Sequence, residues 1–332
     1  MDEIKLPDEM RDVLRASWHR YLDQVQPLRP QLHAYCRRLT RNLWDAEDLV
    51  QESLLKAFGL LGHIDNPIRN PRAYLLRIAT NVWIDTLRRR DHERNLDKYD
   101  PPSEPAPPDT GASVRSAGAV LLHRLPPRER AALILKDVFD MSLDETADVL
   151  ETTVGAVKSA LHRGRAKLLE DETEVVPRRA VPSQALLDRF VERLQARDKA
   201  GLLALVLDNA PAENVGCSYQ FGSEMHRGKR SWFEGATSEH PEWPDWLRWE
   251  ATRVESAVYE GEPVILVFHV RKGIDYLEII LRLEEQDGMV AALRSYGFCP
   301  EVMREVGEAL GHRVNTGLYR YPTPAPGESF GD

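Results

Sequence analysis

The sequence predicts a multidomain protein with two all-α modules, the second containing a helix-turn-helix, and a C-terminal α+β domain with an antiparallel sheet. Apolar residues recur at helical spacing within 10–95 and again within 119–172, which is the main signal for the two helical modules. A proline-rich stretch, 96–118, separates these modules. Beyond residue 183, short alternating segments bounded by glycine turns indicate strands.

Length and composition set the broad class of the protein. The chain has 332 residues, of which 42% are hydrophobic and 29% charged, and a prior of roughly 150 residues per domain suggests two or three globular domains. No apolar stretch approaches the roughly 20 residues that span a bilayer, and the acidic start lacks the pattern of a secretory signal. The widely spaced Cys36, Cys217 and Cys299 argue against a disulfide framework or a zinc site. We therefore expect a cytoplasmic protein with no metal and no membrane partner.

The first helical module, 10–95, contains an acidic helix start. Asp45 is expected to cap a helix, because acids near the first turn interact favourably with the helix dipole. Asp48, Gln51 and Glu52 then share a face that we expect to be exposed and able to bind a partner with basic residues. The alternative is an ordinary first turn, stabilised by the dipole and without a partner.

A turn-rich loop and a basic helix follow in the same module. Tyr74 and Trp83 are interleaved with arginines and asparagines, which suits unstacked bases, since stacking contributes about 1–3 kcal/mol per base and cations track the backbone. The alternative is that both aromatics belong to the core. The residues expected to contact single-stranded nucleic acid are Asn66, Arg69, Asn70, Arg72, Tyr74, Arg77, Asn81, Arg88 and Arg89.

The stretch 96–118 is expected to be an extended linker. It holds five prolines between Asp100 and Asp109 and lacks apolar periodicity. At roughly 3.1 Å per residue in polyproline II form, about twenty residues span about 60 Å. The two helical modules can therefore bind distant parts of one large partner.

The second helical module, 119–172, carries the signals of a helix-turn-helix. Pro127 opens a helix, and Ser142 with Glu145 forms a capping box for a short second helix. Thr153 is placed to cap a third helix after a tight turn. This series of helix, turn and capped helix is typical of the DNA-binding motif.

The third helix of this module has a small, basic face that suits a major groove about 12 Å wide. Its opposite, buried seam includes Gly164, and Arg165 at the edge of the seam is expected to reach a phosphate or an internal acid. The alternative is a three-helix packing module whose basic face is merely solvated. The residues expected to contact duplex DNA are Thr153, Gly155, Lys158, Ser159, His162, Arg163 and Lys167.

The C-terminal block, 183–312, is expected to begin and end with helices, at 183–207 and 300–310. A first strand is expected at 215–221, followed by a short helix at 228–239. Four further strands joined by glycine turns are expected at 249–259, 263–270, 276–283 and 289–296. Residues 313–332 are expected to form a flexible tail.

Aromatic and histidine residues of this block are candidates for a site. Five aromatics could line a pocket, although such a group more often forms a core or an interface: Trp232, Phe233, Trp243, Trp246 and Trp249. The histidines, His226, His240 and His269, are scattered, and lone histidines are usually structural. We therefore expect no catalytic acid–base pair.

Together, the motifs of the two helical modules resemble those of a bacterial RNA polymerase sigma factor of the extracytoplasmic function (ECF) group. The matching segments occur in order over about 20–170 and are DAEDLVQE from Asp45, PRAYLLRIATNVWIDTLRRR from Pro71, LPPRERAALILK from Leu125, SLDETADVL from Ser142 and TVGAVKSALHRGRAKL from Thr153. The resemblance implies a transcription-initiation factor that acts only with core RNA polymerase, is not an enzyme and needs no cofactor.

The resemblance assigns a partner to each predicted surface. Asp48, Gln51 and Glu52 would dock on the clamp helices of the polymerase β′ subunit, with further contacts to the β subunit. The loop at 62–71 and the helix after it would hold the melted minus-ten element of promoter DNA. The third helix of the helix-turn-helix would bind the minus-thirty-five element as duplex, and the linker would thread through the polymerase.

The C-terminal block resembles a SnoaL-like cone of the nuclear transport factor two superfamily, in which a first helix precedes a curved antiparallel sheet. Some sigma factors of this group carry such a domain, which implies a modulator that contacts the sigma domains within the chain. Two alternatives stay open. One is a ligand-sensing or enzymatic cone fused to a DNA-binding regulator, and the other is a conventional DNA-binding activator that does not dock on polymerase.

Overall fold

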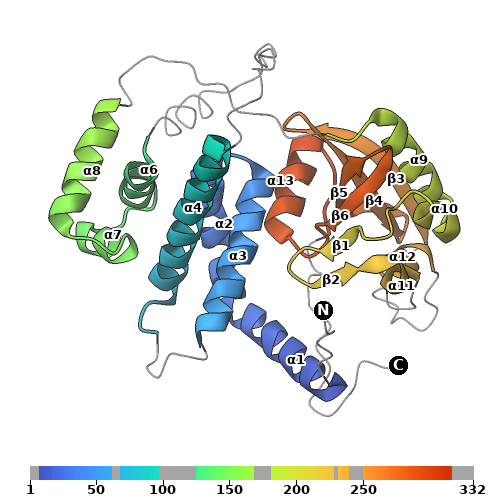
Figure 1. Ribbon diagram of the computed structural model, residues 1–332, viewed down its shortest axis with the longest axis horizontal. Coiled ribbons are helices and arrows are strands. Elements are labelled where there is room, and N and C mark those ends of the chain that lie inside the picture. Colours follow the sequence, from blue (N-terminus) through green and yellow to red (C-terminus); the bar gives the residue numbers. More distant parts are fainter. Residues whose placement is uncertain are drawn as a thin grey trace. The chain divides into compact units, whose positions relative to one another are not determined.

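The computed structural model describes residues 7–61, 68–96, 125–167, 181–227, 231–238 and 250–315 (Figure 1). These residues form two compact units, divided between residues 177 and 178. The first unit holds both helical modules, and the second holds the α+β domain. Several predicted features lie outside the described residues: Asn66, the linker beyond residue 96, His240, Trp243, Trp246 and Trp249.

The first helical module is helical throughout its described residues, as the sequence predicts. Helices α2, α3 and α4 pack together, and their core includes Tyr35, Leu39, Trp44 and Leu54, which are fully buried. Helix α4 lies beside α2 and α3 in this bundle (Figure 1). The elements are α1 Asp8–Val25, the 3-10 turn η1 Gln26–Leu28, α2 Arg29–Thr40, α3 Leu43–Leu61 and α4 Pro71–Leu96.

The start of α3 is capped by Asn42 and not by Asp45. The side-chain oxygen of Asn42 accepts hydrogen bonds from the backbone N–H groups of Trp44 and Asp45, at 2.9 and 3.0 Å. Asp45 lies inside the first turn, where its negative charge still interacts favourably with the helix dipole. The prediction was wrong because asparagine and aspartate are almost equally good caps, so the residue type alone does not choose between them.

The second helical module forms the predicted helix-turn-helix. Its capping box is complete, because the Glu145 N–H donates to Ser142 Oγ at 3.1 Å and the Ser142 N–H donates to Glu145 Oε2 at 2.8 Å. These hydrogen bonds with Ser142 lower the pKa of the Glu145 carboxyl. The elements are α6 Pro127–Leu133, the π turn η2 Ile134–Val138, α7 Leu143–Val149 and α8 Val154–Lys167.

Gly164 allows α8 to lie close to α6. A Cβ atom at this position would come within 2.7 Å of Leu133 Cδ1, and the Leu133 side chain is itself buried. Alanine, which the family resemblance leads one to expect here, would therefore force Leu133 to move. The departure from the family pattern is explained by packing between these two helices.

Among the described residues, the C-terminal unit contains a six-stranded sheet in the order β2-β1-β6-β5-β4-β3. The predicted antiparallel meander is present as β3 to β6. The sheet as a whole is mixed, because β1 pairs with β6 in parallel, with Ala212 opposite Leu293. The strands are β1 Pro211–Asn214, β2 Ser218–Phe221, β3 Ala251–Tyr259, β4 Glu262–Arg271, β5 Ile274–Gln286 and β6 Met289–Ser295.

The turns of the meander follow the predicted glycine signals. Two consecutive positive φ angles define a type I′ turn, whose twist matches that of the flanking strands. Such pairs occur at Glu260 and Gly261, at Lys272 and Gly273, and at Asp287 and Gly288. Glycine at the second position removes the steric cost that a side chain would add there.

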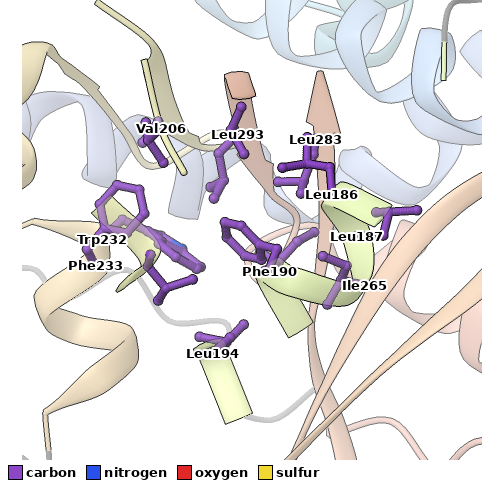
Figure 2. Close-up of a cluster of buried hydrophobic side chains, with 14 of the residues drawn as sticks. Leu186, Leu187, Phe190, Leu194, Val206, Trp232, Phe233, Ile265, Leu283 and Leu293 are labelled. Atoms are coloured by element: carbon purple, nitrogen blue, oxygen red, sulfur yellow. The ribbon is translucent and has the colours of Figure 1, made fainter. Parts of the chain in front are cut away.

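Helices cover this sheet, and the predicted plan of a helix before the sheet is confirmed. The single helix expected at 183–207 is two helices, because the chain turns at Arg197, whose φ is 54°. Phe190 packs with Trp232 and Phe233 in the core of the unit (Figure 2), so these two predicted pocket aromatics are buried core residues. The helices are α9 Gln184–Gln195, α10 Lys199–Leu203, α11 Gly222–Arg227, α12 Trp232–Thr237 and α13 Pro300–Leu310.

The beginning of the predicted tail belongs to the second unit. The Leu277 N–H donates to the carbonyl of Arg313 at 2.8 Å, and the Asn315 side chain donates to Glu278 Oε1 at 3.0 Å. Residues 313 to 315 therefore bind β5, and the predicted boundary after residue 312 was too early. Composition did not reveal this because the bonds join residues far apart in the sequence.

Candidate nucleic-acid interface

Helix α8 exposes the small, basic face that the sequence predicts. Gly155, Lys158, Ser159 and His162 are exposed, and a Cβ atom on Gly155 would meet only Thr153 Oγ1, at 3.9 Å. Within the described part of the chain, Lys158 and His162 have no acid partner. The helix can therefore approach a surface closely at Gly155 and present an uncompensated cation one turn further on.

Two hydroxyl groups of the predicted set already make hydrogen bonds within the module. The Ala156 N–H donates to Thr153 Oγ1 at 3.2 Å, so Thr153 caps α8 as expected. Ser159 Oγ donates to the carbonyl of Gly155 at 3.0 Å. Because each hydroxyl can form further hydrogen bonds, the contacts of Thr153 and Ser159 with DNA stay predictions.

The C-terminal cations of α8 are held by acids of the same module. Arg163 Nε donates to Glu129 Oε1 at 2.7 Å, and Lys167 Nζ lies 3.6 Å from Glu129 Oε2. Arg165 donates two hydrogen bonds, of 3.2 and 2.7 Å, to the carboxylate of Asp137, and this raises the pKa of its guanidinium. The expected internal acid of Arg165 is therefore Asp137, while Arg163 and Lys167 would have to share or exchange Glu129 to bind a phosphate.

The start of α4 is built around Asn70. The Ala73 N–H donates to Asn70 Oδ1 at 3.0 Å, so Asn70 caps the helix. Arg69 is exposed beside it. The cap fixes the direction in which the loop leaves the helix, and a predicted contact of Asn70 with DNA would use its side-chain amide.

Three residues on α4 carry polar atoms that are buried and unpaired among the described residues. These atoms are Tyr74 Oη, Arg72 Nε and Arg77 Nε. Burial also raises the pKa of the Tyr74 phenol. A buried polar group without a partner is costly, which makes these donors suited to an incoming ligand. Trp83, in contrast, is a core residue at 4% exposure.

The next turns of α4 are engaged by acids. Asn81 Nδ2 donates to Glu151 Oε2 at 3.1 Å, and Arg77 Nη1 lies 3.8 Å from Glu151 Oε1. Further along, Arg88 and Arg89 are exposed and lie 3.5 Å from Asp85 and 3.7 Å from Glu52, respectively. Exposed pairs of this kind contribute little to stability, so these arginines can exchange their partners for phosphates.

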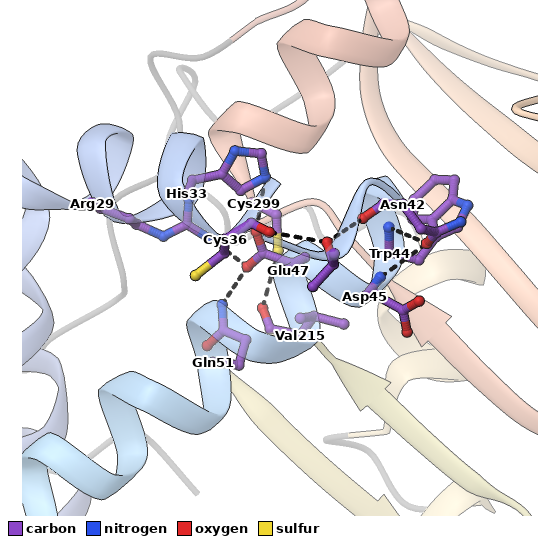
Figure 3. Close-up of polar contacts among 11 residues, drawn as sticks. Arg29, His33, Cys36, Asn42, Trp44, Asp45, Glu47, Gln51, Val215 and Cys299 are labelled. Atoms are coloured by element: carbon purple, nitrogen blue, oxygen red, sulfur yellow. Dashed lines mark hydrogen bonds and ion pairs between the residues drawn. The ribbon is translucent and has the colours of Figure 1, made fainter. Parts of the chain in front are cut away.

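The predicted polymerase-binding face of α3 is only partly exposed. Glu52 is exposed and Asp48 is half-buried, but Gln51 is buried, at 8% exposure. Gln51 Nε2 donates to Glu47 Oε1 at 2.5 Å, and Arg29 Nη2 lies 2.5 Å from the same oxygen (Figure 3). The expectation that Gln51 is exposed was wrong, because it compensates the buried Glu47 carboxylate.

Sequence reasoning missed the acids and the arginine that hold these surfaces in place: Glu47, Glu129, Arg130 and Glu151. Their partners are 18 to 91 residues away, so no local spacing reveals them. Only a weak signal in the sequence points to these four residues. Glu129 stands in the first turn and Arg130 in the last turn of the short helix α6, and charged residues ordinarily face solvent.

The described residues offer neither a metal site nor a membrane-spanning helix. No group of three or more histidine, cysteine or acidic residues in these parts of the chain has a geometry that would hold a metal ion. No helix within the same residues has the length and apolar character needed to cross a membrane.

Comparison with known proteins agrees with this architecture. Residues 24–93 match the family model of sigma-70 region 2, and residues 119–168 match that of sigma-70 region 4. The ECF RNA polymerase sigma factor SigG of Mycobacterium tuberculosis is 35% identical over 217 residues, which cover 54% of this chain and 57% of SigG. The chain therefore spans little more than half the length of that relative.

Two further similarities extend the comparison. The ECF RNA polymerase sigma factor EcfG of Rhodopseudomonas palustris is 33% identical over 150 residues, which cover 44% of this chain and 81% of EcfG. The crystal structure of the Mycobacterium tuberculosis extracytoplasmic function sigma factor SigJ is 21% identical, covers 83% of this chain and 95% of its own, and has a TM-score of 0.32.

A helical bundle followed by a helix-turn-helix with a small basic face defines a DNA-binding protein with two separate helical modules. The first module matches sigma-70 region 2 and the second matches sigma-70 region 4, and this order identifies the kind of DNA-binding protein. The chain belongs to the ECF sigma factors of bacterial RNA polymerase. The relatives named above are sigma factors by name and not enzymes.

Proposed function

We propose that this sigma factor binds core RNA polymerase and directs it to promoters whose two elements it contacts with its two helical modules. The observation that carries the proposal is the exposed face of α8, where Gly155 offers close approach and Lys158 and His162 lack acid partners among the described residues. These residues, with Thr153, Ser159, Arg163 and Lys167, would bind the minus-thirty-five element as duplex.

The minus-ten element would bind along α4. The unpaired donors of Arg72, Tyr74 and Arg77 support this placement, because a melted strand offers acceptors on its phosphates and bases. Extruding a base costs a few kcal/mol, which such contacts must offset. The remaining residues of this proposed surface are Asn66, Arg69, Asn70, Asn81, Arg88 and Arg89.

Docking on the polymerase would use the first helical module. Asp48 and Glu52 are the accessible acids of the proposed face, and we place them against the clamp helices of the β′ subunit, with further contacts to the β subunit. Pull-down of core polymerase by the Asp48→Arg/Glu52→Arg variant should be weakened at least tenfold. Asp23→Arg, which reverses an exposed acid on α1, is the control and should bind normally. Equal binding by both variants would remove this docking surface.

The C-terminal unit would modulate these activities through contacts with the sigma domains. We keep its proposed limits at 183–312, with residues 313–315 added, and those of the sigma modules at 10–95 and 119–172. The unit has its own hydrophobic core, so it folds around residues that the sigma modules do not supply. Removing residues 183–332 should change run-off transcription by several-fold, and unchanged output would leave the unit without this role.

A second candidate function is ligand sensing by the C-terminal unit. It is favoured by a cavity of about 250 Å³ whose lining includes Trp232, His269, Gln220 and Gly235. A Cβ atom on Gly235 would meet nothing within 4 Å, so Gly235→Leu should narrow the cavity. Native mass spectrometry should then show a small molecule that copurifies with the wild-type protein and not with this variant. Identical spectra without bound mass would remove the candidate.

A further inference from the structure

We infer that the cavity of the C-terminal unit binds a neutral ring compound with a hydroxyl group, and that this hydroxyl donates a hydrogen bond to Nε2 of His269. The inference rests on the second candidate function, ligand sensing, and deepens it by naming the class of ligand. The size of the cavity, its uncharged lining and the tautomer of His269 support it.

The size of the cavity limits the ligand to a small molecule. Its volume is about 250 Å³. An apolar cavity of about 150 Å³ in another protein binds benzene, whereas drug-sized ligands occupy pockets of roughly 300–1,000 Å³. A compound of two fused rings, or of one ring with a short substituent, therefore fits this space.

Apolar side chains line much of the cavity. Leu194 comes from α9, Trp232 from α12, and Val267 and Ile279 from the neighbouring strands β4 and β5. Leu194 and Trp232 also belong to the core of the unit (Figure 2), so they hold fixed positions around the cavity. A ligand ring that packs against Trp232 is stabilised by aromatic contact in addition to burial, which favours an aromatic ligand.

The polar part of the lining is uncharged apart from the titratable His269. No aspartate, glutamate, lysine or arginine is among the lining residues that the structure describes. An ionised ligand would lose its hydration there without an opposite charge in contact, and this loss is costly. The lining therefore favours a neutral ligand. Its polar members are Asn214, Ser218, Gln220, Ser231, Thr252 and His269.

His269 supplies a hydrogen-bond acceptor to the cavity. It is 6% exposed, and its Nδ1 lies 2.7 Å from Oε2 of Glu278. Arg271 donates to both oxygens of the same carboxylate, at 2.7 and 3.1 Å, which favours its ionised form. Because a carboxylate only accepts hydrogen bonds, the proton of His269 is on Nδ1, and Nε2 of the neutral ring is an acceptor. The carboxylate on Nδ1 also makes Nε2 more basic, so it suits an O–H donor.

Gln220 supplies a donor to the same cavity. The Trp232 N–H donates to Oε1 of Gln220 at 2.9 Å, which assigns the amide oxygen and leaves Nε2 as the donor atom of this side chain. The cavity thus presents an acceptor from β4 and a donor from β2. A hydroxyl group both donates and accepts hydrogen bonds, so it is complementary to both groups.

The first test compares two probes of nearly the same shape. Isothermal titration calorimetry on the full chain should show that 2-naphthol binds about tenfold more tightly than 2-methylnaphthalene, because only 2-naphthol can donate to His269. Hydrophobicity alone would favour the methyl compound. Equal or weaker binding of 2-naphthol would overturn the inference. Tighter binding of 2-naphthoate than of 2-naphthol would also overturn it, since the cavity would then prefer an anion.

The second test assigns the preference to His269. His269→Asn keeps an amide donor for Glu278 and lacks an acceptor in the place of Nε2. This variant should bind 2-naphthol about tenfold more weakly and 2-methylnaphthalene within about twofold of the wild type. Thr252→Val is the matched control, because Thr252 pairs with His269 across β3 and β4 and lines the same cavity. It should keep the preference for 2-naphthol.

The outcomes separate this inference from the candidate function on which it rests. An equal loss of both probes in His269→Asn, or the same loss of preference in Thr252→Val, would overturn the role of His269. Binding of neither probe by the wild-type protein would overturn the inferred ligand class. The native mass spectra of the wild type and Gly235→Leu would still decide whether the unit binds a ligand of another class.

Discussion

The carboxyl of Glu278, in the C-terminal unit, has a pKa well below that of an ordinary glutamate. It lies in β5 at a bulge, where Val267 pairs with Ile279 but the adjacent Phe268 pairs with Leu277, so Glu278 has no partner in the ladder. A bulge interrupts the alternation of side chains between the two faces of the sheet, and it changes the direction of the Glu278 side chain.

A dense set of donors surrounds the Glu278 carboxylate. His269 Nδ1 donates to Oε2 at 2.7 Å, Arg271 Nε donates to Oε1 at 2.7 Å, and Asn315 donates to Oε1 at 3.0 Å. Because a carboxylate only accepts hydrogen bonds, the proton of His269 is on Nδ1.

The pKa of Glu278 gives the size of the effect. Burial on its own would raise this pKa, but hydrogen bonds from His269 and Arg271, the charge of His269 and the hydrogen bond from Asn315 lower it to about 2. An ordinary glutamate has a pKa of 4.5. At 1.36 kcal/mol for each pH unit, the difference between the two pKa values corresponds to a stabilisation of the folded state by about 3 kcal/mol at most. Since the folded pKa is below the unfolded one, this stabilisation is present above pH 4.5 and is lost as the pH falls toward 2.

Glu278→Gln should therefore lower the free energy of unfolding of the C-terminal unit by about 2–3 kcal/mol at pH 7 and by much less at pH 3. Glu284→Gln, which changes an exposed acid of the same strand, is the control and should cost less than about 0.5 kcal/mol. Amide hydrogen exchange of β4 to β6 peptides in the full chain, measured across a urea series, reports this unit specifically. An equal loss at both pH values would refute the electrostatic reasoning.

Three further predictions concern the sigma modules. Lys158→Ala should weaken binding to duplex promoter DNA about equally for all sequences and reduce the slope of log affinity against log salt by about 0.9, and an unchanged slope would exclude a phosphate contact. Arg130 is buried and donates to the carbonyl of Leu39 at 3.0 Å, so Arg130→Ala should destabilise the sigma unit in urea by about 3 kcal/mol. The exposed Arg128→Ala should cost less than about 0.5 kcal/mol, and equal effects would mean that the contacts of Arg130 do not stabilise the unit. Ser142→Ala should cost about 1 kcal/mol through loss of the capping box, and full stability of that variant in the same measurement would contradict the assigned cap.

Local signals in the sequence predicted most of the fold. The capping box at Ser142 and the I′ turns of the meander depend on residues within four positions of one another, so spacing alone identifies them. Helix α13 begins and ends at the predicted residues, because proline starts it at Pro300 and glycine ends it at Gly311. These elements need no knowledge of the tertiary structure.

Pairing between distant segments was not predictable in the same way. The parallel contact of β1 with β6 joins Ala212 to Leu293, and no periodicity within either segment encodes it. The same reason explains why residues 313–315 were assigned to a tail. A strand's alternation shows that one face is buried, but it does not show which strand will be its neighbour.

The candidate site was predicted at the level of surfaces and less well at the level of residues. Helical spacing placed Gln51 on one face with Asp48 and Glu52. It could not show that Glu47 would be buried against Arg29 of another helix and that Gln51 would bind this carboxylate. Which cations stay available on α8 likewise depends on acids elsewhere in the fold. Lys158 and Arg163 look equivalent in the sequence, yet only Arg163 is held by Glu129.

Multi-round run-off transcription tests whether this protein directs core polymerase to promoters. Purified full-length protein is added to sigma-free core polymerase on a library of promoter fragments, with core polymerase alone as the control. We expect discrete transcripts that require this protein and that disappear when Lys158 and His162 are both replaced by alanine. Transcript patterns identical to those of core polymerase alone on every template would contradict the proposed function.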